Sequence, residues 1–217
     1  MDLRKFRKLP LIGIIRGIKP EQLRPALSAA FEAGLVSVEI TMDTPNAADL
    51  IRAASKAFSG KMSIGAGTVL DVKTLKTALS SGATFIVTPV PAPEVALFCA
   101  KREIPVFPGA FTPAEILSAW NSGATMVKVY PAWAFGPKYI KDLKTGPLSK
   151  VEMMAVGGVT PENAAYYFAA GASAIACGGH VFRKRWMDNG DFKPVKKTAA
   201  AYVEAVRQAL SLYLAKT

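Results

Sequence analysis

The sequence predicts an α/β protein of the (β/α)8 barrel class, with an additional C-terminal helix. Short apolar, β-branched segments alternate with longer amphipathic ones along the whole chain, which is typical of repeated βα units. The 217 residues, of which 51% are hydrophobic and 20% charged, suit one globular domain with a sizeable buried core. We therefore expect a single barrel domain over residues 1–217.

Eight apolar segments have the length and composition of buried strands. In chain order they are residues 10–15, 36–42, 62–67, 84–89, 104–109, 125–131, 151–158 and 172–179. Between them lie helical patterns, several of which open with proline and close with glycine, as in residues 20–34, 113–123 and 161–171. Residues 194–217 are expected to form the additional C-terminal helix.

A weak internal repeat favours closure of these units into a ring. In each copy a glycine ends a helix and a strand follows directly, at Gly34, Gly82, Gly123 and Gly171. A doubly wound open sheet would show the same alternation of strands and helices. Eight strands without an obvious edge strand favour the closed barrel.

The formal net charge of +11 raises the question of nucleic-acid binding. The basic residues are scattered and form no stripe interleaved with aromatic residues, so we expect a solvated surface that attracts small anions and no nucleic-acid partner. Lys138, Lys141 and Lys144 have helical spacing and are expected to lie on one solvated helix face.

Two further features bear on the compartment. Cys99 and Cys177 do not make a disulfide framework for a chain of this length, which favours the reducing cytoplasm. The apolar run from Leu9 to Ile15 is short and is interrupted by Arg16, so we expect neither an export signal nor a membrane partner.

Lys128 lies in the middle of a segment, ATMVKVYPAW, that otherwise has the pattern of a buried strand. An unpaired ammonium group in low dielectric is costly, so such a group usually loses its proton or gains a function. The alternative is that the long side chain reaches out of the barrel mouth and only aids solubility.

Glu39 is the natural partner for this lysine. Aliphatic and polar residues alternate through residues 36–42, so Glu39 should point into the barrel if the aliphatic residues pack under the helices. A structural ion pair, for example with Arg16, would also explain it. A lysine and a glutamate in one barrel interior are the minimum equipment for Schiff-base chemistry, in which a neutral amine attacks a ketone and a carboxylate moves protons.

Other candidate residues follow the strands at the end where barrels build their sites. They are Arg16, Thr41, Thr68, Thr88 and the two pairs Gly157–Gly158 and Gly178–Gly179. Glycine pairs at the last two strands, each leading into a helix, can form a phosphate-binding cradle. His180, the single histidine, either contacts phosphate or merely follows the second glycine turn. No metal site is expected, since no Cys/His cluster has ligand spacing.

Several of these segments resemble one family. They are LPLIGIIRGI, VEITMDTP, IGAGTVL, FIVTP, VKVYPAWAFGPKYIKDL and AVGGVTPEN, and they match the class I KDPG/KHG aldolases in collinear order from about Leu9 to Phe182. Within that family the likeness is strongest to the 2-dehydro-3-deoxy-6-phosphogalactonate aldolases.

The resemblance implies a homotrimeric TIM barrel that cleaves 2-keto-3-deoxy-6-phospho sugar acids to pyruvate and glyceraldehyde 3-phosphate, without a metal or organic cofactor. It places the Schiff-base lysine on Lys128 and the proton-shuttling glutamate on Glu39. Substrate binding is then expected from Arg16, Thr68 and the backbone near Pro89 for the carboxylate, and from Gly157, Gly158, Gly178 and Gly179 for phosphate.

Two departures from the family pattern concern substrate choice. The phosphogluconate branch has a threonine where this chain has Val156, so a hydrogen bond to a substrate hydroxyl near C4 is lost and the C4 epimer stays open. That branch also has an arginine where this chain has Asp43, which leaves anion binding to Arg16 and backbone groups. The alternatives are 4-hydroxy-2-oxoglutarate aldolase activity, or another phosphate-binding barrel lyase or isomerase.

Overall fold

The computed structural model describes residues 1–214 and contains one parallel sheet in the strand order β5-β4-β3-β2-β1-β9-β8-β7-β6. The strands are β1 (Leu11–Ile15), β2 (Ser37–Thr41), β3 (Ser63–Gly67), β4 (Ile86–Val87), β5 (Val106–Phe107), β6 (Gly109–Ala110), β7 (Val127–Val129), β8 (Met153–Val156) and β9 (Ala174–Cys177). Every pairing between neighbouring strands is parallel.

The sheet closes through Pro108. This residue separates β5, which pairs with β4, from β6, which pairs with β7. Because proline has no backbone N–H, the hydrogen-bonded ladder is interrupted there although the chain runs on as one strand. Counted in this way the nine segments are eight strands in a closed ring, and the barrel prediction is confirmed.

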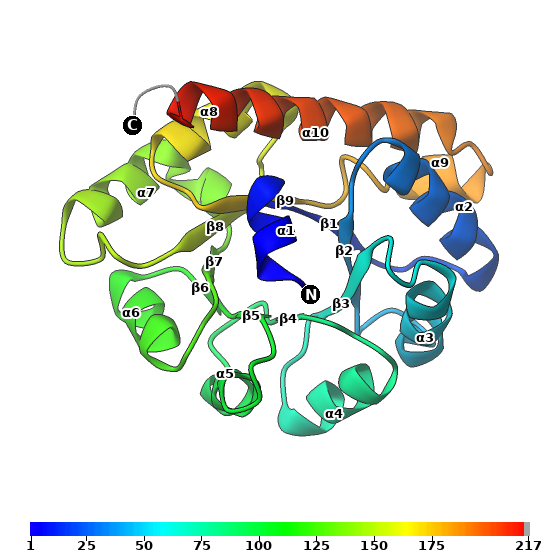
Figure 1. The fold of residues 1–217 in the computed structure, drawn as a ribbon, viewed down its shortest axis with the longest axis horizontal. Coiled ribbons are helices and arrows are strands. Elements are labelled where there is room, and N and C mark those ends of the chain that lie inside the picture. The colour runs from blue at the N-terminus through cyan, green and yellow to red at the C-terminus, as the bar shows by residue number, and fades with distance from the viewer. Residues whose placement is uncertain (215–217) are drawn as a thin grey trace.

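The helices surround this ring in chain order (Figure 1). They are α1 (Leu3–Lys8), α2 (Pro20–Glu32), α3 (Ala47–Ala57), α4 (Val72–Ser80), α5 (Pro93–Ala100), α6 (Pro113–Asn121), the 3-10 helix η1 (Ala132–Ala134), α7 (Gly136–Thr145), α8 (Pro161–Ala169), α9 (Lys184–Asp188) and α10 (Lys193–Leu214). As expected, α2, α6 and α8 open with proline, whose missing N–H would be unpaired in a first turn in any case. The repeated glycines Gly34, Gly82, Gly123 and Gly171 all have φ between +90° and +97°.

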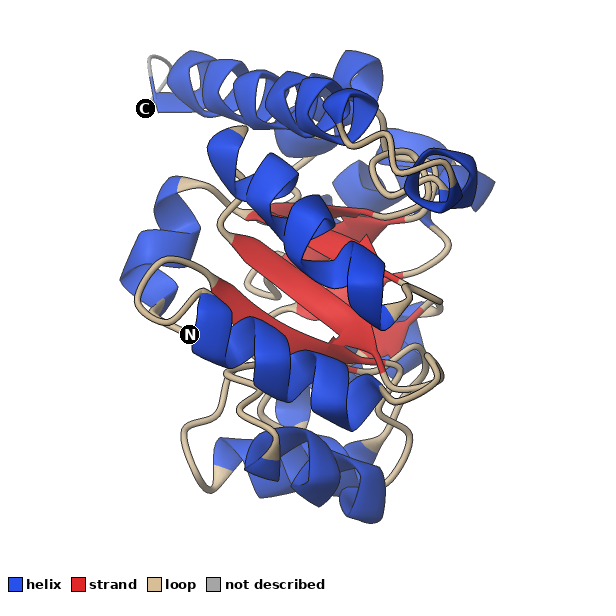
Figure 2. Cartoon of the chain, turned by 90° about the vertical axis from the view of Figure 1, so that its right-hand side faces the viewer, coloured by secondary structure: helices blue, strands red, loops and turns tan. Residues whose placement is uncertain are grey.

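Two separate apolar clusters result from the alternation of side chains along the strands. The outer cluster lies between the sheet and the helices and includes Val38, Ile40, Val127 and Val129. The inner cluster fills the barrel with Phe6, Ile12, Phe85, Val87, Phe107, Met126, Met154, Val156, Ala174 and Ala176. Figure 2 shows the strands running side by side within the shell of helices. The residues of the inner cluster are therefore those whose side chains point into the barrel.

Helix α1 closes one end of the barrel, a feature that the sequence did not lead us to predict. It lies across the centre of the ring in Figure 1. Its Phe6 is buried and meets the Phe107 ring edge-on at 5.8 Å between centroids. Asp2 caps the helix by accepting from the N–H groups of Arg4 and Lys5. With this end closed, the carboxyl ends of the strands form the only barrel mouth in the described chain.

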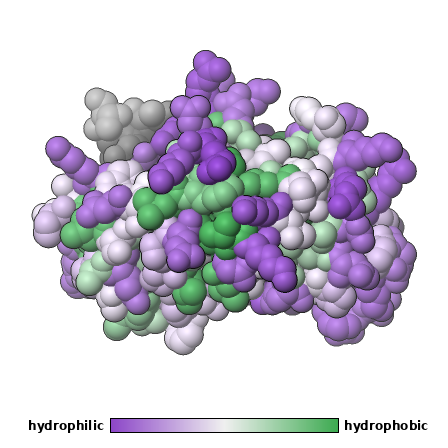
Figure 3. All heavy atoms as spheres, turned by 90° about the horizontal axis from the view of Figure 1, so that it is seen from below, coloured by the Kyte–Doolittle hydropathy of each residue, from purple (hydrophilic) through white to green (hydrophobic). Residues whose placement is uncertain are grey.

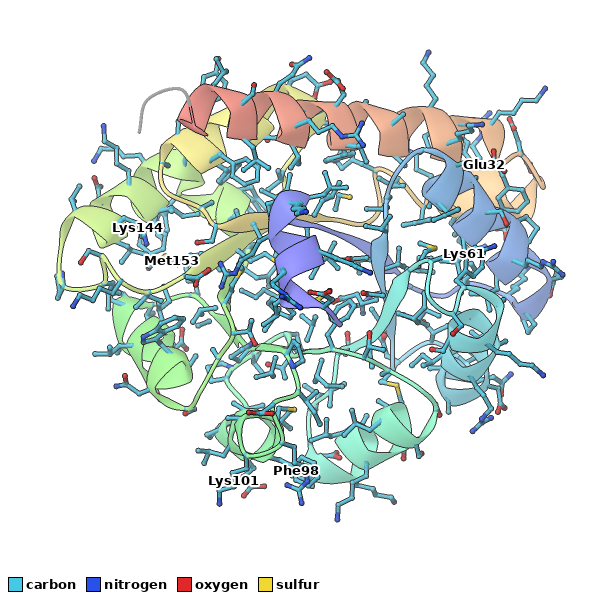
Figure 4. All side chains as sticks on the ribbon, viewed as in Figure 1. Glu32, Lys61, Phe98, Lys101, Lys144 and Met153 are labelled. Atoms are coloured by element: carbon cyan, nitrogen blue, oxygen red, sulfur yellow. The ribbon has the colours of Figure 1, made fainter. Side chains whose placement is uncertain are left out.

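The C-terminal helix α10 runs along one side of the barrel and packs against α8 and α2. Lys196 binds Glu32 of α2 at 2.8 Å, and Figure 4 shows Glu32 next to α10. The buried Tyr202 hydroxyl donates to the carbonyl of Val159 at 2.8 Å. The expected C-terminal helix is thus present over residues 193–214, and residues 215–217 of that prediction lie outside the described residues.

The expectation of one solvated lysine face on α7 is wrong for Lys144. Lys138 is exposed and pairs with Asp142 at 2.6 Å. Lys144 is half-buried, and its Nζ donates to the carbonyls of Ser149 at 2.6 Å and Val151 at 3.0 Å. Figure 4 places it on the side of α7 that faces β8, so it holds the chain that leads into this strand. Among residues 1–214, no helix has the length and apolar character needed to cross a membrane.

Candidate functional site

Lys128 is on the inner face of β7. Met126, two residues earlier, belongs to the inner cluster, while Val127 and Val129 belong to the outer one. Lys128 pairs in register with Gly109 of β6 and Met154 of β8, and it is only 7% exposed. The side chain therefore does not extend into solvent, which removes the solubility interpretation.

Glu39 lies on the inner face of β2, with Val38 and Ile40 packed on the outer side. It is 2% exposed. The neighbouring β3 contributes Gly67, and a Cβ at this position would overlap the Glu39 carboxylate. The absence of a side chain at Gly67 thus makes the room in which this carboxylate lies.

The two buried groups influence each other's protonation. Burial raises the pKa of Glu39, and the positive charges of Lys128 and Arg16 offset part of this rise. Burial lowers the pKa of Lys128, the Glu39 carboxylate raises it in part, and Arg16 lowers it further. Both shifts favour the neutral form, so the barrel interior holds an amine that releases its proton more readily than usual and a carboxyl group that retains its proton more readily than usual.

Arg16 follows β1 at the barrel mouth. Its guanidinium pairs with Asp43 and donates from Nη2 to the Thr68 hydroxyl at 3.1 Å. The ion pair between Glu39 and Arg16 that we gave as an example of a structural role is not formed, since Arg16 pairs with Asp43 instead. Thr68 has φ +56°, a strained conformation for a β-branched residue, and such strain tends to occur at functional sites.

A second turn at the mouth follows β4. The buried Thr88 hydroxyl donates to the carbonyl of Val90 at 2.5 Å and accepts from the Gly109 N–H at 3.2 Å. A Cβ at Gly109 would overlap the Pro89 carbonyl. This close approach fixes the backbone around Pro89 against the strand next to β7.

The two glycine pairs share one cavity of about 220 Å³. It is lined by Val156, Gly157 and Gly158 from the end of β8, by Gly178, Gly179 and His180 from the end of β9, and by Ile14, Tyr130, Val159, Ala176 and Cys177. Gly157 and Gly158 have φ of +93° and +72°, which glycine accepts without strain. The expected association of these pairs at one place is thus present.

Tyr130 connects this cavity to the lysine. Its ring lines the cavity, and the Lys128 Nζ lies 5.4 Å from the ring centroid. We did not single out Tyr130 from the sequence, although its position two residues after Lys128 places both side chains on the same strand face. Gly67 and the pairing of Asp43 with Arg16 were also missed, since nothing in their local sequence indicates those contacts.

The structure brings Lys128, Glu39, Arg16, Thr68, Pro89 and the glycine pairs to the inner face and mouth of one barrel. His180 is exposed at the rim of the glycine cavity. Within residues 1–214, no three His, Cys, Asp or Glu side chains form a group that could hold a metal ion.

The sequence matches the family model described as KDPG and KHG aldolase over residues 3–198. The chain belongs to this aldolase family. It is 37% identical to the 2-dehydro-3-deoxy-6-phosphogalactonate aldolase of Escherichia coli strain K12, an alignment that covers 94% of this chain and 97% of that protein.

Two solved structures are similar to this aldolase. One is described as the native KDPGal structure, with a TM-score of 0.87 and 37% identity over 94% of this chain and 97% of that one. The other is a cube-shaped, highly porous cage designed by fusing symmetric oligomeric domains, with a TM-score of 0.89 and 36% identity over 96% of this chain and 76% of that one.

The space beside Glu39 leads to a first prediction. In Gly67→Ala the new methyl group displaces the carboxylate, so we expect the rate of aldol cleavage to fall by about 100-fold, similar to the loss expected when Glu39→Gln removes the carboxylate altogether. Circular dichroism should show a folded protein. Gly146→Ala is the matched control, because its Cβ meets only ordinary contacts at 3.9 Å. Unchanged turnover in Gly67→Ala would contradict the placement of Glu39 in the reaction.

The lowered pKa of Lys128 predicts a pH-dependent stability. The unfolded chain keeps this proton up to about pH 10.4, whereas the folded protein releases it earlier, so between the two pKa values the unfolded state binds more protons and stability rises with pH. Lys128→Met cannot release this proton, so its free energy of unfolding lacks this rise, which is at most about 1.4 kcal/mol per pH unit.

Urea unfolding from pH 7 to 10, with both proteins in a Glu39→Gln background, isolates the contribution of the lysine. The free energy of unfolding with Lys128 present should rise relative to Lys128→Met as the pH increases. Lys138→Met, which removes an exposed lysine, corrects for the loss of one surface charge. A difference that does not change with pH would contradict the lowered pKa.

Proposed function

We propose that this aldolase cleaves 2-keto-3-deoxy-6-phospho sugar acids to pyruvate and glyceraldehyde 3-phosphate through a Schiff base on Lys128. The observation that carries the proposal is a buried amine whose pKa is lowered, in the same barrel interior as a buried carboxyl group whose pKa is raised. A neutral amine attacks carbonyl carbon, whereas an ammonium ion does not.

In the first half-reaction the Lys128 Nζ adds to the C2 ketone and forms a carbinolamine. Glu39, in its protonated form, gives a proton to the C2 hydroxyl, which leaves as water, and an iminium ion remains. The carboxylate of Glu39 then takes the proton of the C4 hydroxyl. The C3–C4 bond breaks, its electron pair moves to the iminium as an enamine, and glyceraldehyde 3-phosphate departs.

In the second half-reaction the enamine carbon C3 takes a proton, and water hydrolyses the resulting iminium to pyruvate and the free amine. Glu39 is the group within the barrel that can supply and receive these protons. Low water access inside the barrel strengthens the electrostatic attraction between the iminium and the Glu39 carboxylate. No step requires a metal or an organic cofactor.

The substrate carboxylate is assigned to Arg16, the Thr68 hydroxyl and the backbone near Pro89. Arg16 has donors beyond those used by Asp43 and Thr68, since a guanidinium carries five N–H groups. Asp43 neutralises part of its charge, so the attraction for the carboxylate is weaker than that of an unpaired arginine. Asp43 and Thr68 in return hold the guanidinium in position at the mouth.

The phosphate end is assigned to Gly157, Gly158, Gly178 and Gly179. Their backbones border the same cavity, and α8 begins a few residues after the first pair. Backbone N–H groups next to a helix N-terminus attract phosphate. The Tyr130 ring lines this cavity and its centroid lies 5.4 Å from the Lys128 Nζ, so the proposed phosphate end and the lysine lie on either side of one aromatic ring.

Two substrate series compete, because the family model covers KDPG and KHG aldolases and the Escherichia coli relative is named for the phosphogalactonate compound. Val156, which faces the inner cluster and lines the glycine cavity, offers no hydrogen bond to a C4 hydroxyl. We therefore favour the phosphogalactonate series, with 4-hydroxy-2-oxoglutarate as the second candidate.

We also propose that the protein is a homotrimer of the cytoplasm. Figure 3 shows apolar residues gathered on the face that α5 occupies, where Leu97 is 48% exposed. An exposed patch of this kind is typical of an interface, and the similar designed cage is built from symmetric oligomeric domains. Cys99 and Cys177 are both free, as expected in a reducing compartment.

A third prediction tests the Schiff base. Borohydride added with pyruvate should reduce the iminium and leave a stable adduct on the peptide that contains Lys128, detected by mass spectrometry. Lys128→Arg should abolish the adduct. Lys144→Arg should keep it, although burial also lowers the pKa of Lys144. An unmodified Lys128 would rule out the mechanism.

A fourth prediction concerns the C4 epimer. Pyruvate release should be faster from the galactonate-derived phosphate than from the gluconate-derived one, and Val156→Thr should shift the ratio of kcat/KM toward the gluconate compound by about tenfold, the value of one hydrogen bond. An isomerase would release no pyruvate from either compound. If Val156→Thr leaves the ratio of kcat/KM unchanged, residue 156 does not determine the preference for one C4 epimer.

A further inference from the structure

A second cavity of about 810 Å³ lies outside the barrel mouth, where α8, α9 and α10 meet. Its lining comes from the first residues of α8, the segment after β9, Trp186 of α9 and the first turns of α10. It holds none of the glycines assigned to phosphate binding, and His180 is the residue that both cavities share. A cavity of this volume is large enough for a complete small organic molecule.

Three of its side chains are cations, one from the segment before α9 and two from α10. Arg183 precedes α9, and Lys193 and Lys197 lie in the first turns of α10. None of the three forms an ion pair with another residue among 1–214. Glu162 is the one acidic residue in the lining, so the cavity carries an excess of positive charge.

The neighbouring Lys196 shows that the lysines of α10 do not all point into the cavity. Lys196 is the direct neighbour of Lys197, but it points to α2 and pairs with Glu32 at 2.8 Å. Two adjacent lysines of α10 thus serve different surfaces, and the one that lines the cavity has no described partner. Cations gathered in a concave site attract anionic small molecules.

The remaining lining offers a flat apolar surface. The half-buried Trp186 has the Arg183 guanidinium 4.9 Å from its ring centroid, which places a cation and an aromatic face side by side. Tyr202 is fixed, because its hydroxyl donates to the Val159 carbonyl. Pro161 and Pro194 add rigid apolar contacts.

From these observations we propose that the cavity between α8, α9 and α10 binds a second small molecule, an organic phosphate that carries a flat ring. Arg183, Lys193 and Lys197 hold the phosphate, and Trp186 packs against the ring. The site is separate from the chemistry of Lys128, so its occupancy can be measured without an activity assay.

The three tryptophans of the chain make a direct test possible. Trp186 lines this cavity, Trp133 lies beside Gly158 next to the glycine cavity, and Trp120 lies on α6 away from both. With 5-fluorotryptophan incorporated, each residue gives its own ¹⁹F NMR signal, assigned by single Trp→Phe variants. Titration with AMP, which joins a phosphate to a flat ring, should shift the Trp186 signal to saturation and leave the Trp120 signal unchanged.

Matched probes and variants define the outcomes. Inorganic phosphate and adenosine each lack one half of the recognised group and should bind at least about tenfold more weakly than AMP, a loss of about 1.4 kcal/mol. The double variant Lys193→Gln/Lys197→Gln should weaken AMP binding by a similar factor, whereas Lys196→Gln should not. The proposal is overturned if the Trp186 signal stays fixed, if only Trp133 responds, or if the double variant binds AMP as well as the parent protein.

Discussion

The burial of one amine and one carboxyl group inside the same barrel is the constraint on which the structure of this aldolase depends. Neither group would be stable there as an isolated charge, because removal from water penalises the charged form of each. Their mutual attraction offsets part of this penalty, and the shifts of both pKa values toward the neutral forms reflect the rest. The same physical conflict that costs stability favours the roles that we propose for these residues, Lys128 as nucleophile and Glu39 as proton carrier.

The remainder of the barrel interior maintains this environment. The inner cluster fills the space below the pair, and α1 closes the far end with Phe6. Within residues 1–214 the interior therefore opens only at the carboxyl ends of the strands. Small residues are placed where functional groups need room, as at Gly67 beside Glu39 and at Gly109 beside Pro89. Packing and the proposed catalysis therefore depend on the same set of inward-facing residues.

Around this centre the mouth divides into two regions of different character. Arg16, Asp43 and Thr68 form a fixed polar group on the side of β1 to β3. The glycine pairs after β8 and β9 leave backbone exposed on the other side. A substrate with a carboxylate at one end and a phosphate at the other fits such a division, with its ketone between the two ends near Lys128. The basic cavity between α8, α9 and α10 lies next to the glycine pairs, because His180 lines both cavities.

Periodicity along the chain was sufficient to predict the eight strands, the glycine helix ends and the inward direction of Glu39 and Lys128, because these features depend on local backbone geometry. The motifs around Lys128 and Glu39 also identified the family. The predicted barrel also implied that these two residues share one interior. Only the tertiary structure showed how β2 and β7, which are not neighbours in the sheet, come together when the ring closes through Pro108. The packing of α1 into the barrel, the pairing of Arg16 with Asp43 and the cavity between α8, α9 and α10 likewise depend on contacts between distant segments, which no local pattern encodes.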